Sequence, residues 1–366
     1  MTRDQATTDL RGAAVWITAF ASLGVVAVLA WALAVGLSRS RPVGDGRDPA
    51  TYGFDLAGLR GEPGLATSGH PRDFLPSLDR PSTIAGAEVA EYNRTHRRRP
   101  VVSADRVVGV TIAGESRAYP LPLLETHEVV NDELGGVPIA VSFSPLADGA
   151  VVFRRDVGGR VREFALSGLL LDASHLLYDR RMPGLSEGGA SPSLWSPIRG
   201  RAVSGPETDA SLDLVPGVSL ATWSDWLAAH PETTVALGDE ASRLRGRQIN
   251  YARYLESPGV GRPVRGVARD EDAPKEPVLM LRDAGGAWRV LDLAALRQSA
   301  DSGGWTEVTE PKSRLMISRD ARGYLLEDVE VVAVPCLRFA AEAAVAAAGS
   351  EASEPAAEDP QTAITP

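Results

Sequence analysis

The stretch RAYPLPLLETHEVVNDELGGVPIAVSFSPL, residues 117–146, holds the densest set of polar groups that could act together, set between apolar runs typical of a core. These polar residues are Arg117, Tyr119, His127, Glu128, Asn131 and Asp132. Polar groups are costly to bury unless they are paired. We therefore expect this stretch to form either a functional site or a tightly paired structural network.

The last part of the stretch predicts a β-strand. From residue 137 to residue 144, large apolar side chains alternate with small or polar ones, which is the period of a half-buried strand. Ser142 and Ser144 are expected on the face opposite the large apolar side chains.

The middle of the stretch predicts a helix from Pro122 to about Val130. Proline suits the first turn of a helix, and apolar residues then recur at spacings of three and four. On such a helix His127 and Asn131 share a face that points inward or to the edge of a cleft. The paired glycines at 135 and 136 would end the helix.

The start of the stretch predicts a strand preceded by another at 107–112. Arg117 and Tyr119 lie two residues apart, so both side chains point to one face. Together they suit a bound carboxylate or phosphate, or they pair within the fold with Glu128 or Asp132.

An internal repeat links two distant segments. GESRAYPLPLL (114–124) and GAWRVLDLAAL (286–296) share a glycine, an arginine and two leucines at one offset, each after a strand-like run. Such self-similarity is typical of a duplicated unit. The second copy has Ser299 and Gly303 where the first has His127 and Asn131, so we expect any chemistry in the first copy.

An N-terminal segment predicts membrane attachment. Residues 13–37 contain no charged residue, and about 20 apolar residues span a bilayer, whereas the apolar part of a cleaved signal has about 7–15. We expect a single-pass transmembrane helix in the cell membrane, with a signal cleaved near residue 34 as the alternative. Arginines flank both ends in similar number, but large domains cross membranes regardless of such charges, so we expect the main domain outside the cytoplasm.

Composition sets the remaining boundaries of a strand-rich α+β chain. We predict a short polar N-terminus (1–12), a linker (38–65), a main repeat unit that carries the site (66–260), a second, degenerate repeat unit (261–340) and a tail (341–366) that is disordered, with a short helix at its start as an alternative.

Charge and cysteine content restrict the classes of function. The net charge of −10 argues against a nucleic-acid partner. The single cysteine, Cys336, allows no internal disulfide and no cysteine-rich metal site.

The chain resembles the domain of unknown function 3179 family. The resemblance rests on GHPRDFLPSLDRP (69–81), HEVVND (127–132), SGLLLD (167–172), LLYDR (176–180), GRAVSG (200–205) and TWSDWLAAHPETTVAL (222–237), and spans about residues 66–340. Relatives carry the motif CPLC after the central strand, where this chain has Ser144 and Ala147 in place of both cysteines. If relatives use that pair for a metal or thiol step, the resemblance implies that this chain has lost it, so no cofactor is predicted here.

Several chemistries compete at the first copy. A zinc-protease site needs a second histidine four residues after His127, and Asn131 stands there instead. His127 paired with Asp132 or Asp179 would suit acid–base catalysis, with Glu128 as a second orienting carboxylate. Ser144 beside His127 would suit a nucleophile, although no GxSxG motif surrounds it.

The alternative interpretation is structural. Glu128, Asn131 and Asp132 would cap and brace the turn that follows the helix. Tyr178, Asp179 and Arg180 are expected in the same polar network, and Trp195 is either core or a ligand platform. We therefore predict first a non-catalytic, membrane-anchored binding or scaffold domain for a small molecule or an envelope protein, and second a hydrolase-like or metal-dependent enzyme.

Overall fold

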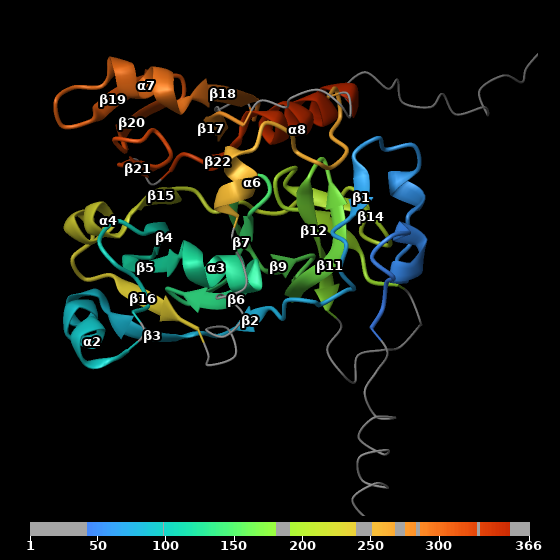
Figure 1. The fold of residues 1–366 in the computed structure, drawn as a ribbon, viewed down its shortest axis with the longest axis horizontal. Coiled ribbons are helices and arrows are strands. Elements are labelled where there is room, and N and C mark those ends of the chain that lie inside the picture. The colour runs from blue at the N-terminus through green and yellow to red at the C-terminus, as the bar shows by residue number, and fades with distance from the viewer. Residues whose placement is uncertain are drawn as a thin grey trace, which may run out of the picture. The chain divides into compact units, whose positions relative to one another are not determined.

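The computed structural model describes residues 42–97, 99–180, 191–238, 251–267, 275–282, 286–327 and 330–351 (Figure 1). They form a strand-rich α+β fold, as predicted, and from Val43 onward they belong to one unit. The predicted membrane helix at 13–37 lies outside the described residues. Within the described ranges no helix is both long and apolar enough to cross a membrane.

The largest sheet draws its strands from both repeat units. Its order is β19-β20-β21-β15-β4-β5-β16-β3, antiparallel throughout except for β5 and β16. The bounds are β3 (Ser82–Ala85), β4 (Arg106–Ile112), β5 (Glu115–Pro120), β15 (Ser219–Thr222), β16 (Thr234–Leu237), β19 (Trp305–Thr309), β20 (Lys312–Ile317) and β21 (Tyr324–Leu326). The two predicted units therefore share one sheet.

Two further sheets carry the polar stretch and its neighbours. The four-stranded sheet is β2 (Leu78–Asp79), β6 (Val129–Leu134), β7 (Val137–Ser144) and β8 (Gly149–Arg154). The five-stranded sheet is β1 (Leu65–Thr67), β11 (Glu163–Leu171), β12 (Ser174–Arg180), β13 (Leu194–Ser196) and β14 (Arg201–Ser204).

Smaller elements complete the described fold. A three-stranded sheet has the order β18 (Trp288–Asp292), β17 (Pro277–Arg282) and β22 (Ala333–Leu337), and β9 (Asp156–Val157) pairs with β10 (Arg160–Val161). The helices are η1 (Pro49–Tyr52), η2 (Ala57–Leu59), η3 (Gly86–Glu88), α2 (Val89–Thr95), α3 (Leu121–His127), α4 (Trp223–Ala229), α6 (Ala252–Glu256), α7 (Leu293–Ser299) and α8 (Arg338–Glu351).

The helix in the polar stretch is shorter than predicted. It ends at His127 because Glu128 adopts a left-handed conformation, with φ of 59°, and its N–H bonds the Leu124 carbonyl. Asn131 and Asp132 then lie on β6, and the paired glycines form the β6–β7 turn instead of ending a helix. The prediction that His127 and Asn131 share a helical face was wrong, because one residue with positive φ redirects the chain into a strand.

The predicted strand at 137–144 is β7, and both of its faces are buried. Ile139, Val141 and Phe143 contribute to one apolar cluster, whereas Ala140 contributes to another. Ser142 and Ser144 share the face of Ala140, as the alternation predicts. The second face is covered by the five-stranded sheet and α8, and this burial places the two serines in the interior.

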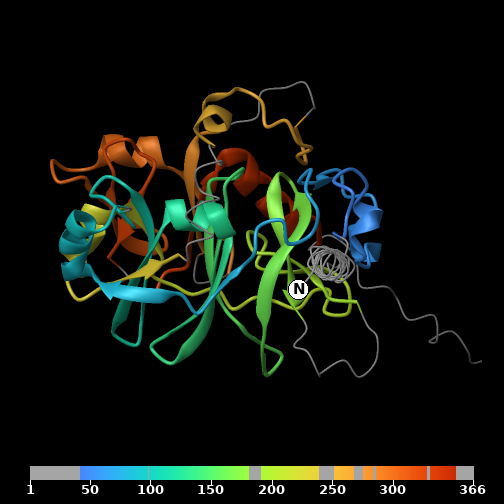
Figure 2. The ribbon, with the colours of Figure 1, turned by 60° about the horizontal axis from the view of Figure 1, so that its bottom comes forward.

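The internal repeat recurs in the order of elements. β4-β5-α3-β6-β7 in the first copy corresponds to β17-β18-α7-β19-β20 in the second, with the helix following the second strand directly each time. The two copies are joined by main-chain hydrogen bonds: β21 pairs with β15 of the first copy, and Leu337 N of β22 bonds Ala147 O beside β8 at 2.8 Å. Figure 2 shows the orange and red C-terminal elements beside the cyan and green elements of the first copy. Each copy is therefore completed by the other.

Both predicted ends of the folded region need correction. The described part of the predicted linker carries η1 and η2, and its Tyr52, Phe54 and Leu59 are buried in an apolar cluster. The predicted tail begins inside α8, where Ala341, Ala344 and other small side chains pack on the core. Both predictions rested on composition. A segment with few aromatic residues or many small ones can still pack when the surface beside it is apolar.

Candidate functional site

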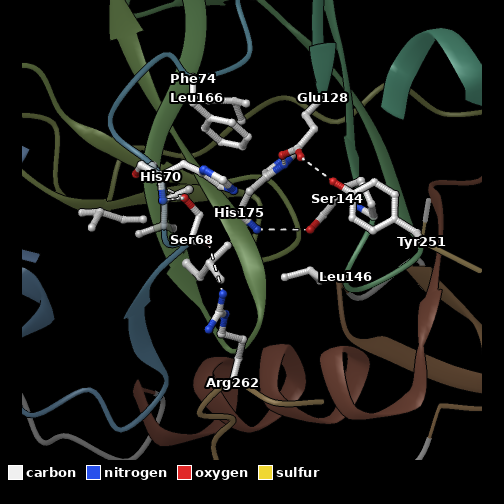
Figure 3. Close-up of a pocket in the computed structure, with 15 residues that line it drawn as sticks. Ser68, His70, Phe74, Glu128, Ser144, Leu146, Leu166, His175, Tyr251 and Arg262 are labelled. Atoms are coloured by element: carbon white, nitrogen blue, oxygen red, sulfur yellow. Dashed lines mark hydrogen bonds and ion pairs between the residues drawn. The ribbon is translucent and has the colours of Figure 1, made fainter. Parts of the chain in front are cut away.

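A pocket of about 230 Å³ opens between the β7–β8 turn, the β11–β12 hairpin and the segment around α6 (Figure 3). The apolar part of its lining is Phe74, Pro145, Leu146, Leu166, Leu169, Leu170 and Leu176, and its polar part is Ser68, His70, Glu128, Ser144, His175, Tyr251 and Arg262. A mainly apolar cavity with a few convergent polar groups is typical of a small-molecule site.

A buried hydrogen-bonded chain lies at the wall of this pocket. His175 Nε2 is 2.7 Å from Ser142 Oγ, and His175 Nδ1 is 3.0 Å from Glu128 Oε2. The three residues come from β7, β12 and the end of α3, and each is less than 10% exposed. The main-chain N–H of His175 also donates to Ser144 Oγ at 3.2 Å. The imidazole is therefore fixed at both ring nitrogens, and the main chain of His175 is held by a third contact.

The backbone is unusual at Glu128 and in the turn that leads to His175. Glu128 has φ of 59°, and Asp172 and Ala173, in the turn before β12, have φ of 51° and 57°. Residues other than glycine rarely adopt this left-handed region, and they concentrate where a side chain must be aimed at a functional site. The conformation of Glu128 turns its carboxylate toward His175 instead of along the helix.

Tyr251 lines the pocket beside Glu128. Its hydroxyl lies 3.5 Å from Glu128 Oε1, and burial, together with the charge of Glu128, raises the pKa of Tyr251. The phenol thus stays protonated and remains a donor. Lys275 holds the adjoining helix in place, because its ammonium donates to the carbonyls of Tyr254, Ser257 and Gly259 at 2.7–2.8 Å.

His127, the first predicted catalytic residue, does not line the pocket and bonds the main chain of Pro76. Its Nδ1 lies 2.7 Å from the carbonyl oxygen of Pro76, and the side chain is 1% exposed. Glu128, the next residue, lines the pocket. The structure therefore separates two adjacent residues that we expected to act together.

Asp132 pairs with the two strand residues predicted to share a face. Its Oδ2 accepts from Arg117 Nη1 at 2.7 Å and from Tyr119 OH at 2.8 Å. Burial and the adjacent Asp132 charge raise the pKa of Tyr119 well above its usual value. Of the two arrangements left open by the sequence, pairing within the fold is the one the structure contains.

Asn131 connects two sheets. Its amide donates to Asp79 Oδ1 at 2.8 Å and to Phe164 O at 2.9 Å, and its Oδ1 accepts from Phe164 N at 2.9 Å. Arg180 bonds the other oxygen of Asp79 at 2.6 Å. Asn131 and Arg180 therefore belong to one network, as predicted, and that network joins β6 to β11.

Tyr178 and Asp179 point to opposite sides of β12. Tyr178 donates to Asp73 and lies 3.8 Å below the guanidinium of Arg72, and burial raises the pKa of Tyr178 to about 12. Asp179 accepts from Arg162 at 2.6 Å.

Trp195 packs in the core. Its side chain is fully buried, and its ring makes an edge-to-face contact with Phe164 at 5.8 Å. Its indole N–H lies 3.4 Å from Asp179 Oδ1.

The positions of the missing cysteine pair fall at the edge of the pocket. Ser144 lines the pocket, and Ala147 is fully buried in the turn that follows. Ala147 N bonds Ser144 O at 3.1 Å, so the two residues enclose one tight turn. In the described part of the chain, no group of three or more His, Cys, Asp or Glu side chains is placed to hold a metal ion.

Ser142, His175, Tyr251 and Arg262 are site residues that sequence reasoning did not select. The alternation of residues 137–144 placed Ser142 correctly on its face, but its contact with His175 spans 33 positions of sequence and two sheets. Only the arrangement of those sheets brings the two side chains together.

The fold and the pocket define a strand-rich α+β domain with a mainly apolar pocket that a buried glutamate, Glu128, lines. Comparison with known families matches residues 72–330 to a family described as protein of unknown function (DUF3179). The match covers most of the chain, so the protein belongs to this family. No curated protein and no solved structure gives a significant match.

Proposed function

We propose that this protein is a ligand-binding domain that holds a small molecule with an apolar body in the pocket beside Glu128. The observation that carries the proposal is the chain from Ser142 through His175 to Glu128, which fixes a buried carboxylate at the wall of an otherwise mainly apolar cavity. Binding sites need a few rigidly placed polar groups to orient a ligand.

The surroundings of Ser142 favour binding over catalysis. Ser142 does not line the pocket; it borders a separate cavity of about 10 Å³ behind the imidazole of His175, which has room for about one water molecule. Ser142 also lies within the regular strand β7 and not on a sharp turn that presents a nucleophile. Its hydroxyl is therefore placed to hold the imidazole of His175.

Acyl hydrolysis is the second candidate. Its support is the order of the contacts, Ser Oγ to Nε2 and Nδ1 to a carboxylate, which is the order that serine hydrolases use. A fluorophosphonate probe tests this directly. We expect no labelling of the chain; labelling that Ser142→Ala abolishes would place hydrolysis first.

Histidine resonances provide a test of binding on the full chain. The chain has five histidines; His70 and His175 line the pocket, whereas His96 and His230 do not. With histidine-labelled protein and benzyl alcohol as probe, we expect shifts for His70 and His175 but none for His96 and His230.

A blocking variant identifies the pocket as the place of binding. Leu146 lines the pocket and is partly exposed, so Leu146→Trp fills the cavity without adding volume to a closed core. We expect this variant to abolish the shifts, and Leu296→Trp, on a helix remote from the pocket, to preserve them. Shifts that persist in Leu146→Trp would contradict the proposal.

We also propose that residues 13–37 anchor this domain in the cell membrane, with the domain outside the cytoplasm. The support is the uncharged length of that segment. Carbonate washing of membranes and protease treatment of intact cells provide the test. We expect the chain to stay with the membrane and to be cleaved from outside; release by carbonate would contradict the anchor.

A further inference from the structure

We propose that the pocket selects ligands that carry a cationic amine on an apolar body, with the amine against Glu128. This inference rests on the proposed binding function and names the class of ligand.

Buried carboxylates in this protein are paired with arginine. Asp132 has Arg117 at 2.7 Å, Asp172 has Arg199 at 2.7 Å, and Asp148 has both terminal nitrogens of Arg106 at 2.9 Å. Each of these aspartates is 5% exposed or less. A buried negative charge is costly without a cation beside it, and at these three positions the fold supplies one.

Glu128 is a buried carboxylate that lacks such an arginine partner among the described residues. It is 7% exposed, and within the described ranges its ion-pair partner is the imidazole of His175, with no arginine or lysine. A neutral imidazole donates one hydrogen bond but adds no positive charge. The carboxylate therefore faces the pocket without the counter-charge that the other three have.

Glu128 also has unused acceptor capacity. Its Oε2 accepts from His175, but among the described residues Oε1 has only the Tyr251 hydroxyl at 3.5 Å, at the outer limit of a hydrogen bond. A carboxylate accepts about four hydrogen bonds. An ammonium group in the pocket would supply both the missing charge and short N–H donors.

The rest of the lining sets the shape of the ligand. The pocket volume of about 230 Å³ and the leucines around it suit a body of roughly one ring. In Figure 3, Arg262 lies across the pocket from Glu128, where it disfavours a second cation. The geometry therefore fits a small monoamine whose far end is neutral or acidic.

Benzylamine and benzyl alcohol form a matched pair for the test, because they share the ring and differ in the polar group. The full chain is titrated with each at about pH 8, where an ordinary imidazole is neutral and a primary amine is charged, and the shifts of His70 and His175 are followed. We expect benzylamine to bind about tenfold or more tightly than benzyl alcohol.

Two substitutions assign that preference to Glu128. Glu128→Gln removes the charge and keeps the shape, and it should reduce the difference between the two probes to about twofold or less. Glu133→Gln removes an exposed carboxylate from the neighbouring strand β6 and should leave the difference unchanged. If Glu128→Gln fails to fold, Leu146→Trp should abolish the binding of both probes, which places the preference in the pocket that Glu128 lines.

The outcomes separate this inference from the proposed function. Equal binding of both probes, or tighter binding of the alcohol, would overturn the amine preference while the pocket remains a binding site. A preference that survives in Glu128→Gln would also overturn it. Failure of both probes to shift His70 and His175 would overturn both proposals.

Discussion

At the scale of single residues, His127 and Glu128 show how one backbone angle separates neighbouring side chains. His127 ends α3 and points to the carbonyl of Pro76, whereas Glu128, at φ of 59°, points into the pocket. The separation was not predictable, because the left-handed region is rarely adopted by glutamate.

Substitution of His127 tests its structural role. His127→Ala removes a buried imidazole and its hydrogen bond to the Pro76 carbonyl, so we expect the free energy of unfolding to fall by about 1–3 kcal/mol. Benzyl alcohol should still shift His70 and His175, because His127 does not line the pocket. Unfolding in urea and the titration together measure both effects. Unchanged stability with lost binding would instead assign His127 to the site.

Predictions from residue type alone succeeded where pairing is local. Arg117 and Tyr119 alternate on one strand, and both reach Asp132 as expected. His175 and Ser142 were beyond reach, because their contact depends on how two sheets face each other.

At the scale of elements, the clearest periodicity gave the most accurate prediction. The alternation at 137–144 coincides with β7, because a strand with two distinct faces shows its period directly. The residues just before it, VVNDEL, lack such a period, and there the predicted helix ran to about Val130, into the first residues of the strand β6.

The β4–β5 turn offers a test of local turn chemistry. Ala113 and Gly114 both have positive φ, at 51° and 83°, and this pattern is typical of a type I′ turn, in which asparagine–glycine is preferred. We expect Ala113→Asn to raise the free energy of unfolding by about 0.5–1 kcal/mol. Ala113→Val should lower it, because a β-branched residue adopts positive φ poorly. The same direction of change in both variants would contradict this reasoning.

At the scale of the whole molecule, the buried tyrosines set the response to alkaline pH. Burial raises the pKa of Tyr119 well above its usual value and that of Tyr178 to about 12. In the unfolded chain a tyrosine loses its proton near pH 10. Between these pKa values the unfolded chain ionises and the folded protein does not, so stability is fully present below about pH 10 and declines above it.

Urea unfolding between about pH 8 and pH 11 measures this decline. We expect Tyr119→Phe to make it less steep, by up to about 1.4 kcal/mol per pH unit, because one tyrosine no longer titrates. The absolute stability of this variant also changes, since Asp132 loses a donor, so the slopes are compared. An unaltered slope would mean that Tyr119 does not contribute.

Truncation tests how far the folded region extends. A chain that stops after residue 351 keeps α8 and should unfold at the same temperature as the full chain. A chain that stops after residue 337 loses α8 and exposes the side chains it covers in the core, among them Ala340 and Ala344. We expect this shorter chain to be insoluble, because a core that loses a whole helix leaves a large apolar face in water.

The pairing between strands of the two copies has a consequence for how the chain folds during synthesis. β8 receives its neighbour β22 only about 180 residues later in the chain, and β15 waits about 100 residues for β21. As the chain leaves the ribosome, its first half has unpaired sheet edges and exposed apolar side chains. Such surfaces invite association between nascent chains. We therefore expect folding after release from the ribosome, slow for the size of the domain, and dependent on a chaperone that protects the emerging half.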